Sequence, residues 1–195
     1  MARVDNTSFY NLSIKKYKKT AMGVHWASEA RQTLRFKIFK HLLEKRLHES
    51  CIVDAGCGFA DLYRYLKKEK VLPLEYIGLD SHPNMVDLAR KSTKQRILHV
   101  DVLTAVLPQA DYYICSGAMN LLEPFETLLF IKQMLRYANK GVLFNILKGD
   151  DDSDTYNKYL PQQMREALSF FSGDIEIIED YLDDDFTVFM QKSAF

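Results

Sequence analysis

Residues 51–61 constrain the fold of this chain more than any other segment. They read Cys-Ile-Val-Asp-Ala-Gly-Cys-Gly-Phe-Ala-Asp, so an apolar run that favours a buried strand leads into two glycines and then into a predicted helix. Glycine lets the backbone turn sharply and lets a ligand approach it closely. The segment therefore predicts a strand, a tight turn and a helix that together border a ligand site.

Acids at both ends of this segment separate two ligand chemistries. A dinucleotide-binding loop reads G-x-G-x-x-G and presents helix N–H groups to a pyrophosphate. Asp61 occupies the position of the third glycine here, and its carboxylate would repel the phosphates. A ligand with a cationic amine and no phosphate suits Asp54 and Asp61 better, and S-adenosylmethionine (SAM) is such a ligand. An oxidoreductase on the same fold is therefore disfavoured.

Strand and helix patterns alternate along the chain, which predicts an α/β fold with a doubly wound, mostly parallel sheet of seven strands. The last two strands are too close together for a crossover helix, so they should form a C-terminal antiparallel hairpin. Ser28 is the expected N-cap of the first helix. The expected helices span 27–48, 60–69, 83–91, 124–138 and 158–171, and the expected strands span 51–55, 76–79, 97–100, 112–115, 142–147, 175–179 and 186–191.

Four segments in this order resemble the Rossmann-like (class I) SAM-dependent methyltransferases. Residues 53–61 are similar to their first motif, with Ala60 in place of a glycine, where its methyl group should slightly narrow the ligand space. Residues 76–80 are similar to the second, whose terminal acid holds the ribose hydroxyls. Asp101-Val102 matches the position beside adenine, and residues 111–118 match the strand beside the reacting centre. Further segments, including Gly23-Val24-His25-Trp26, resemble a bacterial subfamily for which the resemblance supplies no substrate.

The resemblance and the chemistry of SAM predict a set of cofactor-binding residues at the carboxyl ends of the strands. Asp80 should bind the ribose diol, Asp54 and Asp61 the ammonium, and Asp101 with Val102 the adenine. Each has a structural alternative: a helix cap for Asp80, a favourable helix-dipole contact for Asp61 and a turn for Asp101. The complete set is Asp54, Gly56, Gly58, Asp61, Asp80, Ser81, Asp101, Val102 and Ser116.

The catalytic residues and the methyl acceptor are less constrained. Methyl transfer from a sulfonium depends mainly on positioning, although a protonated acceptor also needs a base. The polar or aromatic candidates near the predicted mouth are His25, Asn120 and Asn145, with Tyr10 and Tyr17 beside them. Arg35 could reach the cofactor carboxylate, but an arginine on a basic amphipathic helix is more often solvated.

The charge is zero overall and unevenly spread. Residues 1–46 carry a net charge of +8 and residues 150–195 a net charge of −9. Two solvated faces that attract each other are the favoured interpretation, and a basic arm that binds an anionic partner is the alternative. The main prediction is methyl transfer to a small or medium-sized acceptor. An RNA methyltransferase using the basic arm and a non-catalytic SAM-binding protein are the alternatives.

The remaining expectations concern organisation and location. One domain is expected over 1–195, in which a helical N-terminal extension (1–48) precedes a SAM-binding core (50–195). Residues 1–33 are expected to close over the cofactor as a lid, and a fixed helix over 8–19 on the edge of the sheet is the alternative. The three cysteines read as reduced thiols. No histidine spacing predicts a metal site. No membrane-spanning or signal segment is recognised, so a cytoplasmic protein without a membrane partner is expected, with its oligomeric state open.

Overall fold

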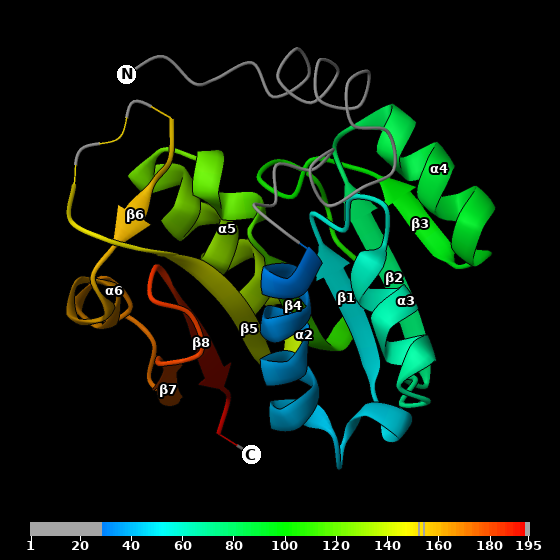
Figure 1. Cartoon of the computed structure of the whole chain (residues 1–195), viewed down its shortest axis with the longest axis horizontal. Helices are drawn as coiled ribbons and strands as arrows, with labels where there is room; N and C mark the ends of the chain where they lie inside the picture. The colour runs from blue at the N-terminus through cyan, green and yellow to red at the C-terminus, as the bar shows by residue number, and fades with distance from the viewer. Residues whose placement is uncertain (1–28, 152, 154, 194–195) are drawn as a thin grey trace.

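The computed structural model describes residues 29–193 except 152 and 154 (Figure 1). The predicted succession of helices and strands is confirmed, with most boundaries shifted by one to three residues. The helices are α2 (Glu29–Leu43), α3 (Asp61–Lys68), α4 (Pro83–Thr93), α5 (Pro124–Tyr137) and α6 (Pro161–Ala167), with short 3₁₀ turns η2 (Leu47–Glu49) and η3 (Ala118–Leu121). The strands are β1 (Cys51–Ala55), β2 (Glu75–Asp80), β3 (Arg96–His99), β4 (Ala110–Ser116), β5 (Ala138–Lys148), β6 (Lys158–Tyr159), β7 (Asp174–Ile178) and β8 (Asp185–Gln191).

One mixed sheet contains all these strands, in the order β3-β2-β1-β4-β5-β8-β7. The first five are parallel, whereas β8 runs antiparallel between β5 and β7. The Rossmann-like fold and the C-terminal hairpin are thus confirmed. The short strand β6, which pairs with the end of β5, was not predicted. It occupies the start of the helix expected over 158–171, which begins only at Pro161.

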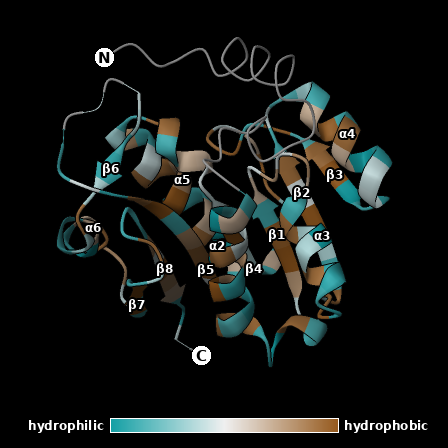
Figure 2. Cartoon of the chain, viewed as in Figure 1, coloured by the Kyte–Doolittle hydropathy of each residue, from teal (hydrophilic) through white to brown (hydrophobic). Residues whose placement is uncertain are grey.

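Helices cover both faces of the sheet because strand side chains alternate between two apolar layers. The α2 face packs Phe36 and Phe39 of α2 and Leu62 of α3 onto Ile52 and Leu143. The opposite face packs α5 and α6 onto the other set of strand side chains. Figure 2 shows the strands mostly brown and much of the outward helix surface teal. No helix in the described part of the chain is both long and apolar enough to cross a bilayer.

The first described helix, α2, is shorter than expected. It ends at Leu43 rather than near residue 48, and the η2 turn then leads into β1. The expected N-cap Ser28 lies outside the described residues, as does most of the segment expected to form a lid.

Polar side chains replace apolar ones where the strands end on the α2 face. Ile114 and Leu143 are apolar, but two residues further along the same strands come Ser116 and Asn145. Asn145 pairs in register with both Ser116 and Thr187, so these three side chains form a row across β4, β5 and β8. The carboxyl edge of the sheet therefore carries a row of polar side chains on the α2 face.

Candidate cofactor site

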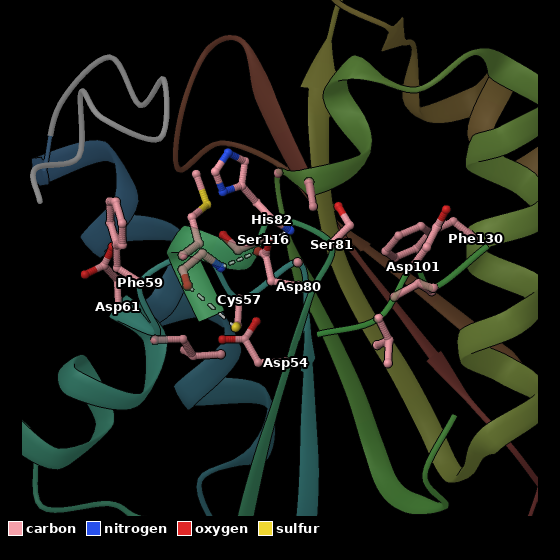
Figure 3. Close-up of a pocket in the computed structure, with 18 of the residues that line it drawn as sticks. Asp54, Cys57, Phe59, Asp61, Asp80, Ser81, His82, Asp101, Ser116 and Phe130 are labelled. Atoms are coloured by element: carbon pink, nitrogen blue, oxygen red, sulfur yellow. Dashed lines mark hydrogen bonds between the residues drawn. The ribbon is translucent and has the colours of Figure 1, made fainter. Parts of the chain in front are cut away.

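A cavity opens at the carboxyl ends of β1, β2 and β4 (Figure 3). All nine residues of the predicted cofactor set line it, and their contact with SAM itself stays a prediction. Sequence reasoning missed several further lining residues. They come from α2, from the start of α4, from the loop after β3 and from α5: Gln32, Phe36, His82, Met85, Leu103 and Phe130. No local pattern marks them, except that His82 follows Asp80 by two positions.

The glycine turn between β1 and α3 forms the floor of the cavity. Gly56 and Gly58 have φ angles of 76° and 53°, which side-chain-bearing residues adopt only with strain. A Cβ atom on Gly56 would lie 2.2 Å from the Cβ of Ala118. Gly56 is therefore required both by its backbone conformation and by the close approach of the turn that follows β4.

Ala60 differs from its expected role. The sequence predicted that its methyl group would narrow the ligand space, but Ala60 is buried outside the cavity lining. Its backbone is left-handed (φ 59°, ψ 46°), and it caps the N-terminus of α3. Alanine in this conformation strains the backbone, which explains why a glycine suits the position. Alanine at this position therefore strains the backbone and does not narrow the space for the ligand.

Asp80 is held rigidly at the end of β2. Its Oδ2 accepts a hydrogen bond from the Gly58 N–H at 2.8 Å, and its Oδ1 accepts one from the His82 N–H at 2.8 Å. Burial raises the pKa of Asp80, while the two backbone donors oppose that rise. A carboxylate has about four acceptor positions, so two remain to receive the hydroxyls of a ligand.

Asp54 lies deeper in the cavity, where it accepts a hydrogen bond from the Tyr76 hydroxyl at 2.6 Å. Burial raises the pKa of Asp54 from 3.8 to about 7, although the Tyr76 hydrogen bond lowers it and Asp80 raises it further. Burial thus disfavours the ionised form of Asp54, and a cationic group beside the carboxylate would stabilise it.

The other two cavity acids have structural duties as well. Asp61 is the first residue of α3, where a carboxylate favours the helix dipole, and it forms an ion pair with Arg64. Asp101 accepts a hydrogen bond from the Leu103 N–H at 2.9 Å, so the alternative role in a turn is observed. Neither duty removes the side chain from the cavity lining.

The electrostatic character of the cavity follows from this inventory. Four aspartates line it, and no lysine or arginine is among its lining residues in the described part of the chain. Such a site favours a cationic ligand and disfavours phosphate. No group of three or more His, Cys, Asp or Glu side chains within residues 29–193, leaving out 152 and 154, has an arrangement that could hold a metal ion.

The two catalytic candidates in the described part of the chain, Asn120 and Asn145, do not line the cavity. His25 lies outside the described residues, as do Tyr10 and Tyr17. Asn120 in η3 and Asn145 in β5 are both buried. Asn145 lies beside Ser116 on the neighbouring strand, with its Nδ2 3.5 Å from the Ser116 hydroxyl. The buried Oδ1 atoms of Asn120 and Asn145 accept no hydrogen bond from the described residues. Two buried acceptors thus lie behind the Ser116 end of the cavity.

Arg35 contradicts both of its expected roles. It is neither solvated nor in the cavity: it is 3% exposed and forms an ion pair with Asp185 of β8, with its Nε 2.9 Å from Oδ2. Nearby on the same helix, Arg31 pairs with Asp184. The described part of the basic N-terminal region therefore contacts the acidic C-terminal region, as expected from their opposite charges. The expectation that both faces are solvated is wrong for Arg35 and Asp185, which are buried.

The cysteines are free thiols. Cys57 lines the cavity and Cys115 is buried in β4, and burial is the main cause that raises the pKa of both thiols, that of Cys115 to about 12. Thiols with raised pKa values are poor nucleophiles, so neither is the reactive group of the site.

Comparison with known proteins agrees with this geometry. Residues 52–141 match the model of a family described as a methyltransferase domain. No curated protein matches.

Solved structures of similar fold include a magnesium protoporphyrin IX methyltransferase from Synechocystis with bound S-adenosylhomocysteine (14% identity, 84% of each chain covered, TM-score 0.67). A TehB-like SAM-dependent methyltransferase from Corynebacterium glutamicum is similar over 96% of this chain and all of its own (15% identity, TM-score 0.68). A SAM-dependent methyltransferase from Clostridium acetobutylicum is similar over 95% of this chain and all of its own (12% identity, TM-score 0.66). At these identities the likeness establishes the fold.

Proposed function

We propose that this chain is a SAM-dependent methyltransferase of the Rossmann-like class and that it methylates a small or medium-sized acceptor at the Ser116 end of the cavity. The observation that carries the proposal is the charge of the cavity, which has four aspartates and neither lysine nor arginine among its described lining residues. SAM brings two positive charges, a sulfonium and an ammonium. A polyanionic acceptor would meet repulsion at such a site.

Different residues of the cavity bind different parts of SAM. Asp80, fixed by two backbone donors, binds the ribose diol, because charge-assisted hydrogen bonds to a rigid carboxylate are strong. Asp54 receives the ammonium, since a cation offsets the cost of ionising a buried carboxyl. Asp101 and Val102 border the adenine, and Asp61 adds negative charge near the methionine end.

The acceptor approaches from the side of β4 and β5. Ser116 faces the cavity, and Asn145 supports it from behind. The four aspartates of the cavity repel a polyanion, which disfavours RNA as the acceptor. The basic segment before residue 29, which underlies the RNA alternative, lies outside the described residues.

The test is a labelling experiment with SAM that carries a trideuterated methyl group. The purified protein is incubated with three fractions of a cell extract, namely small molecules, total RNA and total protein, and S-adenosylhomocysteine and the labelled product are identified by mass spectrometry. We expect label in the small-molecule fraction. Label in RNA alone would establish the nucleic-acid alternative. SAM binding with no S-adenosylhomocysteine formed from any fraction would leave a non-catalytic binding protein.

A further inference from the structure

A series of buried and half-buried polar side chains leads from the cavity wall at β4 to helix α2, although these elements are far apart in the sequence. Its members are joined by hydrogen bonds except at the step from Asn145 to Thr187, which are neighbours in strand register. The series begins at Ser116 in the cavity and passes to Asn145, the in-register neighbour of Thr187. The hydroxyl oxygens of Thr187 and Tyr181 lie 2.9 Å apart. Tyr181 then donates to Asp185 at 2.5 Å.

The series ends on α2, at Arg35, whose guanidinium donates twice to Asp185 Oδ2. The helix then returns to the cavity, because Gln32 and Phe36, on either side of Arg35, line it. Gln32 also reaches Asp61, with its Nε2 3.4 Å from Oδ2. The series therefore begins at a cavity-lining residue, Ser116, and ends at Arg35, on a helix whose residues Gln32 and Phe36 line the same cavity.

Helix α2 also makes polar contacts through Arg31, Gln32 and Lys40, but these are exposed or half-buried, whereas the Arg35–Asp185 pair is buried in the interior. Phe36 and Phe39 pack in an apolar layer, and apolar contacts are non-directional, so they permit a helix to slide or rotate. An arginine fork on a carboxylate is directional. Asp185 is itself inaccessible to solvent and bound by Tyr181, so the partner of Arg35 has a fixed position.

We propose that Arg35 and Asp185 are positioning residues that hold α2 against β8 and thereby place Gln32 and Phe36 in the wall of the cofactor cavity. The proposal rests on the proposed cofactor site. It assigns to the C-terminal hairpin a role in SAM binding, although no residue of that hairpin lines the cavity.

The decisive variant replaces the ion pair by an apolar pair, Arg35→Met with Asp185→Leu. Removing one partner alone leaves a buried charge and threatens folding, whereas apolar replacement of both commonly preserves stability. We expect a midpoint of thermal unfolding close to that of the wild type, and SAM affinity about tenfold or more weaker by calorimetry, because small displacements of a binding wall are costly. Hydrogen exchange should be faster in α2 and unchanged in β1 and β4.

The matched control, Arg31→Ala with Asp184→Ala, removes a more exposed ion pair that joins the same helix to the residue before β8. The two side chains are 30% and 57% exposed. It should leave the SAM affinity within twofold of the wild type. Arg35→Lys, which keeps the charge and loses the fork, should bind SAM with intermediate affinity.

Two outcomes separate the inference from the proposed function. Wild-type affinity in the folded Met/Leu variant would overturn the positioning role and leave the cofactor site intact. If the Asp80→Ala variant instead binds SAM as tightly as the wild type, the assignment of the cofactor site is overturned, and the positioning role with it.

Discussion

Asp54 should give SAM binding a distinctive dependence on pH. Its buried carboxyl has a pKa of about 7, against an ordinary value of 3.8, so the site disfavours the ionised form by about 4 kcal/mol. The ammonium of SAM reverses this preference once it binds. The amine of SAM has an α-amino pKa of about 7.7–8.0 and must stay protonated. Affinity should therefore be greatest between about pH 7 and pH 8, and about 15-fold weaker at pH 5.5.

Isothermal titration calorimetry measures this directly. At pH 6.5, roughly three-quarters of the Asp54 carboxyls are protonated before binding, so about 0.7 protons should leave per SAM bound. Titrations in buffers of different ionisation enthalpy report that number. Asp54→Asn should bind SAM weakly and without the acidic limb of the profile. A dissociation constant that is constant from pH 5.5 to pH 7.5, with no proton released, would refute the reasoning.

The raised pKa of Asp54 also predicts that the stability of the folded protein falls as pH rises, whereas SAM binding strengthens over the same pH range. In the unfolded chain Asp54 ionises near pH 3.8, whereas in the folded protein it holds its proton up to about pH 7. Its contribution to the free energy of unfolding therefore falls as pH rises between these values and stays low above them. At pH 8, Asp54→Asn should be more stable than the wild type by up to about 4 kcal/mol in urea unfolding, with no difference below pH 4.

Three further perturbations test other parts of the site. Asp80→Ala should weaken SAM binding about a hundredfold or more in calorimetry, because two charge-assisted hydrogen bonds are lost, while Asp80→Asn, which keeps one acceptor oxygen, should bind better than the alanine variant. Ala60→Gly should raise the midpoint of thermal unfolding by a few degrees, since relief of a left-handed alanine is worth about 1 kcal/mol; a lower midpoint would contradict the strain argument. Deletion of residues 1–24 should leave a cooperatively folding protein with weaker SAM binding and no turnover, and failure of the truncated chain to fold would refute the expected lid.

The sequence predicted best where a local pattern carries the information. The strands β1 and β2 were predicted correctly, and with them the positions of Asp54 and Asp80, because each acid comes at the end of an apolar run that forms a buried parallel strand. The helix that begins at Pro83 was also predicted, since proline favours the first helical position.

What the sequence could not predict depends on contacts between distant segments. Arg35 lies among other basic residues and resembles a solvated charge, because its partner Asp185 is 150 positions away. The left-handed backbone of Ala60 was indicated only by the glycine that the resembled family has at this position, and its conformational meaning became evident from the fold. The strand β6 has only two residues, too few to produce a periodic pattern.

The position of β8 has a consequence for synthesis on the ribosome. This strand lies between β5 and β7 rather than at an edge, and it carries Asp185, yet it follows every other strand in the chain. During translation β1, β2 and β4 can pair first and form the glycine turn, whereas Arg35 of α2 can pair with Asp185 only after β8 has been synthesised. We expect the nascent protein to stay unable to retain SAM until β8 has left the exit tunnel, so that cofactor capture coincides with the last step of folding.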